Sequence, residues 1–482
     1  MSTQIRDGEE FSKWYLDVIK TAELVDQSPV RGCSVIRPYG YAIWENIVKE
    51  LDKRIKEDLG AKNAYFPLLI PESFLKKEKE HVEGFSPEVA VVTHAGGSKL
   101  EEPYVIRPTS ETVIYDMFSR WISSYRDLPL KINQWANVVR WEMRPRPFLR
   151  TTEFLWQEGH TAHESEDEAL KMALDALDMY RDFAHNFLAI PVEVGEKTES
   201  EKFAGAKSTF AVEALMRDGK ALQWGTSHLL SHSFPESFGV KFNDEKGNLS
   251  VPWCSSWGVT TRMIGGIVMV HGDEVGLVMP PKIAPTQVII VPILKKNADN
   301  SAVISAVKKI EKSLKDICIR VESDLSEAKT PGAKFFDYER RGVPLRIEIG
   351  PRDLENGGVI LARRIEIEGQ DKKFFVNFKS LVRAVEAELE VIHHAMFESA
   401  KKFKDDNTHV APDNINFDDL VQEIENKKGF HSVGWCGSAE CEARLKEAKA
   451  STRVIVGKGT VGRKCFACSA DSEYEVLVAR AY

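Results

Sequence analysis

Residues 140–154 read Arg140-Trp-Glu-Met-Arg-Pro-Arg-Pro-Phe-Leu-Arg-Thr-Thr-Glu-Phe154, and this stretch decides how the first half of the chain is interpreted. Strand-like residues stand on both sides of a turn rich in proline and arginine, which predicts a hairpin. Arg140 can bind a phosphoryl group through two parallel hydrogen bonds, and Glu142 on the same strand face can accept hydrogen bonds from an amino group. Phe154 offers a ring on which a base can stack. The hairpin is a candidate nucleotide site, and an arginine-rich surface hairpin is the alternative.

The residues around this hairpin predict one large α/β unit over residues 1–280. Helical periodicity covers Ala42–Leu59, and two further helices are expected to begin at Thr109-Ser110-Glu111 and after a capping box, Ser165-Glu166-Asp167-Glu168. Several strands follow one another without an intervening helix, so an antiparallel sheet is predicted rather than repeated βαβ units. The β-like stretches are Asn63–Leu69, Leu130–Glu142, Phe154–Ala162, Ala221–Leu229 and Met263–His271.

Two smaller domains are expected after this unit. The proline-rich segment Pro280–Pro285 ends it, and residues 281–403 alternate strands and helices as a small α/β domain whose last helix covers Leu381–Phe403. A polar stretch then leads into residues 404–482, expected to be a small α+β zinc-binding domain. Three domains agree with a length of 482 residues at about 150 residues per domain.

Composition excludes several classes of protein. Apolar residues make up 43% and charged residues 29%, which is typical of a globular chain. The formal net charge of −8 means that a nucleic acid would have to bind local basic patches. The longest apolar run, around Val288–Leu294, is far shorter than the roughly 18–20 residues of a membrane-spanning helix. The acidic N-terminus lacks the apolar core of a signal peptide, so a cytoplasmic protein without a membrane partner is expected.

Four of the seven cysteines lie close to the C-terminus, in the pairs Cys436/Cys441 and Cys465/Cys468. Short loops between cysteines deliver two thiolates to one zinc ion, which prefers four ligands in a tetrahedron. In a cytosolic chain this clustering favours a structural Zn²⁺ site over disulfides, with four free thiols or a redox pair as alternatives. Four cysteine ligands would leave no open coordination position, so the predicted metal has no catalytic part.

Two further segments complete an ordered set with the hairpin. Asn63-Ala-Tyr-Phe-Pro-Leu-Leu-Ile-Pro71 follows the first long helix, and Ser255–Gly266 carries Arg262 beside small residues. The helix–strand–proline segment, R-x-E…R-x-x-x-F and G-x-x-x-R resemble motifs 1, 2 and 3 of class II aminoacyl-tRNA synthetases. Neither class I signature, H-I-G-H or K-M-S-K-S, occurs in the sequence.

Shorter motifs along essentially the whole chain narrow the resemblance to the prolyl-tRNA synthetase family, archaeal/eukaryotic-like type with a C-terminal zinc-binding extension. This implies ATP-dependent ligation of L-proline to proline tRNA in two steps through prolyl-adenylate, with Mg²⁺ accompanying ATP. It also implies a homodimer, and too few residues separate motifs 2 and 3 for a cis-editing insertion. The motifs are Ser28–Pro38, Arg107–Glu111, Phe154–His160, Gln223–His228 and His271–Leu277.

The resemblance also implies roles for individual residues. Arg140 and Arg262 are the catalytic residues: Arg140 would contact the α-phosphate and the proline carboxylate, and Arg262 the γ-phosphate together with Arg150. Arg144 and Arg146 compete with Arg150 for that role. The alternative roles are a helix cap for Thr109 and a core position for Trp156. The ATP-binding residues would be Arg140, Glu142, Arg150, Thr151, Phe154, Gln223, Thr226 and Arg262, and the proline-binding residues Phe85, Thr109, Glu111, Arg140, Trp156, Glu158, His160 and His228.

The middle domain resembles a class IIa anticodon-binding domain. Arg346, Glu348, Arg352 and Arg364 are the residues expected to read bases, and a solvated charged strand is the alternative. Two other functions stay open. A threonine-specific synthetase would need a zinc ion in the amino-acid pocket, for which no convincing set of ligands is found. A catalytically inactive tRNA-binding protein would be expected to have lost Arg140 or Arg262.

Overall fold

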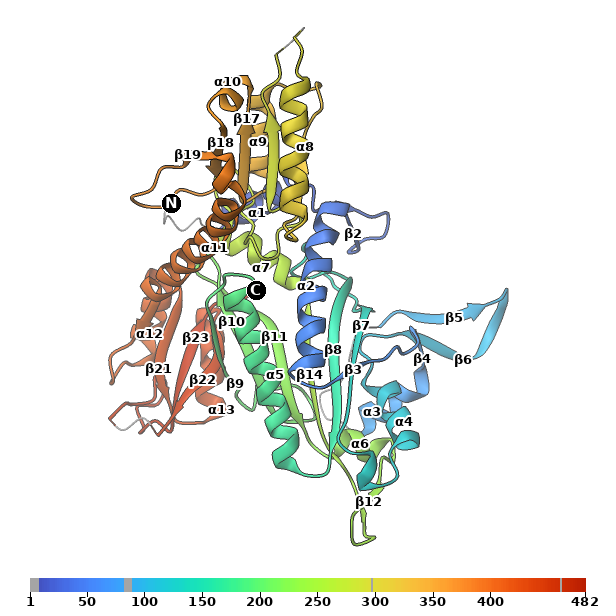
Figure 1. Cartoon of the computed structure of the whole chain (residues 1–482). Coiled ribbons are helices and arrows are strands. Elements are labelled where there is room, and N and C mark those ends of the chain that lie inside the picture. Colours follow the sequence, from blue (N-terminus) through green and yellow to red (C-terminus); the bar gives the residue numbers. More distant parts are fainter. Residues whose placement is uncertain (1–7, 82–88, 296–297, 460–461) are drawn as a thin grey trace.

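The computed structural model describes residues 8–81, 89–295, 298–459 and 462–482 (Figure 1). In this part of the chain the largest sheet has 11 strands in the order β20-β21-β23-β22-β9-β10-β11-β14-β8-β7-β3. From β9 to β7 all neighbours are antiparallel, which confirms the predicted antiparallel sheet. The strands that the N-terminal part contributes are β3 (Lys62–Asn63), β7 (Leu130–Val139), β8 (Glu153–His163), β9 (Val192–Glu196), β10 (Ala206–Leu215), β11 (Ala221–Leu230) and β14 (Trp253–Thr260).

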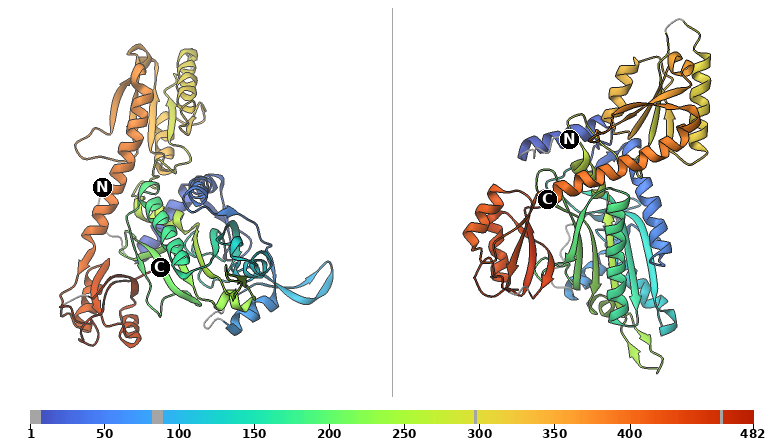
Figure 2. Two further views of the ribbon diagram at one scale, coloured as in Figure 1. Left: turned by 60° about the horizontal axis from the view of Figure 1, so that its bottom comes forward. Right: turned by 60° about the vertical axis from the view of Figure 1, so that its left-hand side comes forward.

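Two long helices cover one face of this sheet, and polar residues line part of the other face. The long helices α2 (Pro38–Glu57) and α5 (Glu166–Asn186) run along the covered face (Figures 1 and 2). The hydroxyl of Tyr180 on α5 donates to Gln157 of β8, which identifies Gln157 as a residue of the covered face. Side chains alternate along a strand, so Trp156, Glu158 and His160 point to the opposite face.

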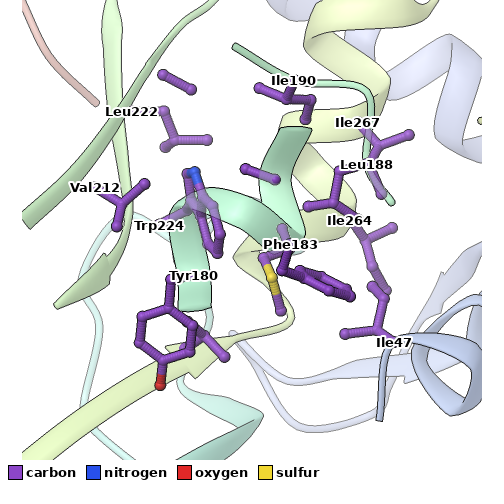
Figure 3. Packing of buried hydrophobic residues seen from close by; sticks show 14 of the residues in the cluster. Ile47, Tyr180, Phe183, Leu188, Ile190, Val212, Leu222, Trp224, Ile264 and Ile267 are labelled. Carbon is purple, nitrogen blue, oxygen red and sulfur yellow. The ribbon is translucent and has the colours of Figure 1, made fainter. Parts of the chain in front are cut away.

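A single apolar core lies between the sheet and these helices (Figure 3). Trp224 of β11 and Tyr180 and Phe183 of α5 meet there, and Ile264 on α7 (Arg262–His271) closes one side. Burial of such side chains contributes about 1.5–3 kcal/mol each, which keeps the sheet rigid under the polar face. The other elements of this part are α1 (Gly8–Thr21), α3 (Glu72–His81), α4 (Glu111–Trp121), α6 (Ser233–Ser237), η1 (Tyr125–Asp127), β1 (Val25–Gln27), β2 (Ser34–Ile36), β4 (Leu69–Pro71), β5 (Val91–Ala95), β6 (Ser98–Ile106), β12 (Phe242–Asn243) and β13 (Leu249–Ser250).

Two predicted strands are wrong. Met263–His271 forms the helix α7, and all of these residues are buried, so no polar face reveals a helical period in the sequence. Asn63–Leu69 divides between β3 and β4, which belong to different sheets. The predicted capping box is half present, because the Ser165 hydroxyl accepts a hydrogen bond from the Glu168 backbone at 3.3 Å.

The middle domain has its own mixed sheet in the order β16-β15-β17-β18-β19. It docks on the N-terminal part through backbone hydrogen bonds, in which Leu277 donates to Arg340 at 3.0 Å and Met279 to Gly342 at 3.1 Å. Its elements are β15 (Val288–Pro292), α8 (Ser301–Lys315), β16 (Val321–Ser323), α9 (Pro331–Arg340), β17 (Leu345–Ile349), α10 (Pro351–Glu355), β18 (Gly358–Arg363), β19 (Lys373–Asn377), η2 (Phe378–Ser380) and α11 (Leu381–Asp406).

The C-terminal part extends the large sheet, an arrangement that the sequence did not predict. The helix α11 passes residue 403 and leads directly into this part (Figure 2). Ile455 of β22 pairs with Glu196 of β9, so a strand of the C-terminal part lies beside a strand of the N-terminal part. No helix among the described residues is both long and apolar enough to cross a bilayer. The C-terminal elements are β20 (Thr408–Val410), α12 (Phe417–Asn426), β21 (Phe430–Trp435), α13 (Ala439–Ala443), η3 (Arg444–Ala448), β22 (Ser451–Lys458) and β23 (Tyr474–Ala479).

Candidate active site

The predicted hairpin is present and joins β7 to β8. Arg140 donates its backbone N–H to Thr152 at 2.8 Å, and Arg146 and Arg150 exchange two backbone hydrogen bonds across the turn. Phe148 and Leu149 at its tip are buried, so the loop is anchored in the core. The arginines of the hairpin therefore have a fixed base on the polar face of the sheet.

Arg140 lies between the two halves of the candidate site. Its Nε donates to the carbonyl of Pro108 at 2.9 Å, and its guanidinium carbon lies 5.5 Å from the ring centroids of both Phe154 and Trp156. Burial lowers the pKa of Arg140, and Glu111 and Glu158 partly offset that effect. These contacts orient the guanidinium beside Phe154, the predicted stacking ring, and beside Trp156, a residue of the predicted amino-acid pocket.

Arg262 begins α7 and completes a cluster of arginines. Its Nε donates to Leu149 at 3.0 Å and its Nη1 to the carbonyl of Gln223 at 2.9 Å. The pKa of Arg262 is lowered to about 10, first by burial and then by the charges of Arg150 and Arg140. Because these like charges repel, a bound polyanion such as a triphosphate would relieve the repulsion.

The remaining nucleotide-side residues surround the same hairpin. Glu142 accepts a hydrogen bond from the Arg144 backbone at 3.1 Å and lies 3.4 Å from the guanidinium of Arg150. Arg150 is exposed and Thr151 half-buried, so both remain accessible to a ligand. Thr226 is half-buried on β11 and is paired with Gly258 of β14.

The predicted amino-acid residues form a second, linked cluster. Glu158 accepts hydrogen bonds from Gln134 at 2.8 Å and contacts His160 Nε2 at 3.0 Å, while Thr109 donates its hydroxyl to Glu111. Burial lowers the pKa of His160, but Glu158 and Glu111 outweigh it and raise that pKa above its ordinary value. Two carboxylates and a histidine therefore share one buried pocket.

Two ring N–H groups of this cluster are buried without a hydrogen-bond partner in the part of the chain that the structure describes. Within the described residues, Trp156 Nε1 and His160 Nδ1 are buried and lack a hydrogen-bond partner. His228 Nδ1 lies 2.9 Å from the hydroxyl of Thr209, and burial together with the charge of His160 lowers the pKa of His228 to about 3. Phe85, also predicted here, lies outside the described residues.

Three supporting residues were missed in the sequence. Gln134 links Glu158 to Ser110 on α4, and Phe203 packs on His228, with ring centroids 4.8 Å apart. Thr209 receives the Phe203 backbone N–H at 2.9 Å. The polar pair Asn133-Gln134 in the middle of a strand-like run was the only signal for Gln134, and nothing local marks the other two.

The four predicted anticodon residues have different surroundings. Arg346 and Glu348 are buried and bonded to each other at 2.8 Å, within a network that includes Glu339. Arg364 is also buried, and both its terminal nitrogens donate to Asp273 of the N-terminal part, at 2.8 and 2.6 Å. Arg352 is exposed. The base-reading role of these residues stays a prediction, and only Arg352 presents an unengaged surface position.

The four clustered cysteines have the geometry of a metal site. Their sulfur atoms all lie within 4.8 Å of one another, and Cys436 Sγ is 3.8 Å from both Cys441 Sγ and Cys468 Sγ. All four thiols are free of disulfides. Zinc–sulfur bonds of about 2.3 Å in a tetrahedron place sulfurs about 3.8 Å apart. The cluster, completed by Cys465, therefore fits a zinc ion with four thiolate ligands.

Comparison with known proteins matches each part of the chain. A family model described as tRNA synthetase class II core domain (G, H, P, S and T) matches residues 93–271, and one described as anticodon binding domain matches residues 287–388. A third, described as prolyl-tRNA synthetase, C-terminal, matches residues 417–482. Together with the antiparallel sheet and its three ordered motifs, these matches define a class II aminoacyl-tRNA synthetase.

Relatives that match almost the full length of the chain identify one family within this class. A proline–tRNA ligase of Natranaerobius thermophilus is 51% identical over 478 residues, which are 98% of this chain and 97% of that protein. Those of Alkaliphilus oremlandii and Borreliella burgdorferi strain B31 are 51% and 48% identical, over 98% of this chain and 96% and 98% of theirs. The chain belongs to the prolyl-tRNA synthetase family, which confirms the resemblance found in the sequence.

Proposed function

We propose that the protein ligates L-proline to proline tRNA in two steps. The proline carboxylate attacks the α-phosphorus of ATP and releases pyrophosphate, and a hydroxyl at the 3′ end of the tRNA then displaces AMP from prolyl-adenylate. The position of Arg140 carries this proposal. One guanidinium lies 5.5 Å from both Phe154 and Trp156, so a single cation reaches the nucleotide and the amino acid.

Positioning and charge neutralisation are the chemistry that this site offers. Arg140 would hold the α-phosphate against the proline carboxylate, and Arg262 and Arg150 would hold the γ-phosphate. Mg²⁺ enters with ATP and neutralises phosphate charge. Phe154 would stack on adenine, with Glu142 and Thr151 at its polar edge and Gln223 and Thr226 along the pocket.

Proline fits the second cluster better than threonine does. Its secondary ammonium carries two protons, which Glu111 and Glu158 can accept, and Trp156 supplies an apolar wall. Thr109, His160 and His228 would complete the pocket, with Phe85 proposed to close over it. Among the described residues, the terminal cysteines form the only group of three or more potential metal ligands, so the pocket offers no zinc set for threonine.

Several further properties belong to the same proposal. The four cysteines would hold a structural Zn²⁺, with no part in the chemistry. The chain would act as a homodimer. It would also lack an editing insertion, because the segment between motifs 2 and 3 is occupied by β8–β14 and α5 of the core fold. The three domains would divide near residues 280 and 403, and Arg352 is the most accessible of the proposed anticodon residues.

Amino-acid-dependent exchange of pyrophosphate into ATP tests the function. Exchange with proline is expected, and Arg140→Ala should reduce it by about 100-fold or more, because a preorganised charge at the reacting phosphate is lost. Arg126→Ala, which changes an exposed arginine far from the hairpin, is the control and should keep full activity. Exchange with threonine alone would overturn the proline assignment, and no exchange with any amino acid would leave the inactive tRNA-binding protein.

A further inference from the structure

The loop over residues 197–205 connects the amino-acid pocket to the C-terminal domain. It follows β9, and Lys197 donates its backbone N–H to Thr209 at 2.7 Å. Thr198 then accepts the backbone N–H of Lys202 at 2.9 Å, which makes the loop a compact unit with Thr198 at its base. Because these hydrogen bonds hold the loop together, a displacement of Thr198 would also displace the residues that follow it.

The far end of this loop lies against the proposed proline pocket. Phe203 packs on His228 with tilted rings whose centroids are 4.8 Å apart, and it stacks on Phe234 at 6.1 Å between ring centroids. The Thr209 hydroxyl accepts the Phe203 backbone N–H and lies 2.9 Å from His228 Nδ1. Movement of the loop would therefore displace the ring that packs on His228 and break the hydrogen bond from the Phe203 N–H to the hydroxyl that contacts His228.

The near end of the loop is bound to Glu442 of the C-terminal domain. Thr198 donates its hydroxyl to Glu442 Oε1 at 2.6 Å, Ser200 donates to Oε2, and Thr452 of β22 donates to Oε1. Glu442 is 7% exposed, and no cation pairs with it within the described residues. Burying a carboxylate without hydrogen-bond donors costs free energy, so the hydrogen bonds from these hydroxyls to Glu442 are expected to be strong.

A second contact fixes the start of the loop to the same domain. The ammonium group of Lys197 donates to the carbonyl of Arg453 at 2.8 Å and pairs with Glu213 at 3.3 Å, and Arg453 itself pairs with Glu213 at 2.8 Å. All three side chains are buried. The loop is thus clamped on two sides by residues that lie more than 240 positions later in the chain.

We infer that Glu442 is a positioning residue for the amino-acid pocket: by holding Thr198 and Ser200 it sets the loop, and through Phe203 it sets His228. This inference rests on the proposed function for the identity of the amino acid. Glu442 touches neither substrate, so its removal should weaken proline binding and leave ATP binding unchanged.

The test compares Glu442→Ala with Glu440→Ala in the full-length protein. Both variants remove one glutamate from α13, but Glu440 is exposed and its side chain does not bind the loop. Loss of hydrogen bonds to a charged group predicts a rise of about tenfold in the KM for proline for Glu442→Ala. The KM for ATP should stay within about twofold, and Glu440→Ala should behave as the unchanged protein.

A change in KM for proline separates positioning from mere stability, because fewer folded molecules would lower the rate without altering KM. Equal KM values for proline in Glu442→Ala and Glu440→Ala would overturn the inference. Absence of proline-dependent exchange in the unchanged protein would instead overturn the proposed function, so the two failures are distinct.

A second pair of variants keeps the test decisive if Glu442→Ala does not fold. Thr198→Val removes the hydroxyl that donates to Glu442, whereas Thr198→Ser keeps it. Thr198→Val should raise the KM for proline and speed tryptic cleavage at Lys202, while Thr198→Ser should leave both unchanged. Identical behaviour of the two Thr198 variants would refute the role of this hydrogen bond.

Discussion

Arg364 joins the anticodon-binding domain to the catalytic domain, and replacing it by alanine is expected to loosen that junction. Its side chain is 3% exposed and makes two hydrogen bonds to Asp273, at 2.8 and 2.6 Å. Breaking a buried ion pair by removing one partner costs about 3–5 kcal/mol. Asp273 is 26% exposed and also accepts backbone N–H groups from Val275 and Gly276, so the lower end, about 3 kcal/mol, applies.

Thermal unfolding measures this effect. A unit of 150–250 residues loses about 2–4 °C of Tm for each kcal/mol, so Arg364→Ala should lower the Tm by about 6–12 °C. Arg352→Ala is the matched control, since Arg352 is an exposed arginine of the same domain, and its Tm should hardly change. Equal Tm values for the two variants would refute the proposal that Arg364 stabilises the contact between the two domains.

The same pair predicts a pH dependence with a definite sign. Burial raises the pKa of Asp273, but the hydrogen bonds and charge of Arg364 and the backbone donors outweigh burial and hold that pKa below its ordinary value. A lowered carboxyl pKa contributes stability above the unfolded value of about 3.9, and this is lost as the pH falls through the folded value. The Tm difference should be constant from about pH 5 to 8 and should shrink progressively as the pH falls below the unfolded value of about 3.9 and through the lower folded value. A difference that does not shrink in acid would contradict the ion pair as its source.

Three further predictions concern the pocket, the metal site and the sheet. The pKa of His160 is raised, so its ring is fully protonated below pH 6.5 and loses the proton as the pH rises through the folded-state pKa. The KM for proline should increase over that pH range, and Glu158→Gln should move this increase to lower pH. A KM that does not change with pH would contradict a role of protonated His160 in proline binding. Cys465→Ser should reduce zinc content measured by elemental analysis from one ion per chain, and Cys318→Ser, at an exposed cysteine elsewhere, should not. Gly159→Ala would place a Cβ 2.1 Å from the buried Trp257 ring and should lower the free energy of unfolding, measured with denaturant, by about 1–3 kcal/mol. Gly266→Ala is the control, because its Cβ would lie 3.6 Å from Leu222 and should leave that free energy unchanged. Equal free energies of unfolding for the two variants would contradict the packing argument.

Local patterns were sufficient for most of the elements in this chain. The family resemblance of the motif Phe154–His160 implied pocket roles for Trp156, Glu158 and His160, and all three lie on one face of the sheet because a strand has a period of two residues. The spacing of Cys436 and Cys441, and of Cys465 and Cys468, likewise predicted the cluster that the structure brings together. In both cases the information lies within a few consecutive residues.

The features that could not be predicted from the sequence depend on contacts with residues far away in the chain. The helix α7 is buried on all sides, so Met263–His271 shows neither helical nor strand periodicity to the reader of the sequence. The contact of Arg364 with Asp273 could not be predicted either, because Asp273 lies 91 residues away in the sequence. Glu442 was not predicted as a functional residue, because the loop hydroxyls of Thr198 and Ser200 that it binds lie more than 240 residues earlier.

The pairing of β22 with β9 has a consequence for synthesis on the ribosome. Until β22 emerges, this side of β9 is an unpaired sheet edge with Gly195 uncovered, and such edges recruit other strands. The nascent catalytic domain therefore exposes this edge until Ser451–Lys458 has been synthesised, and chains that terminate before β22 would keep the edge exposed. Premature termination should accordingly produce aggregates rather than a smaller working enzyme.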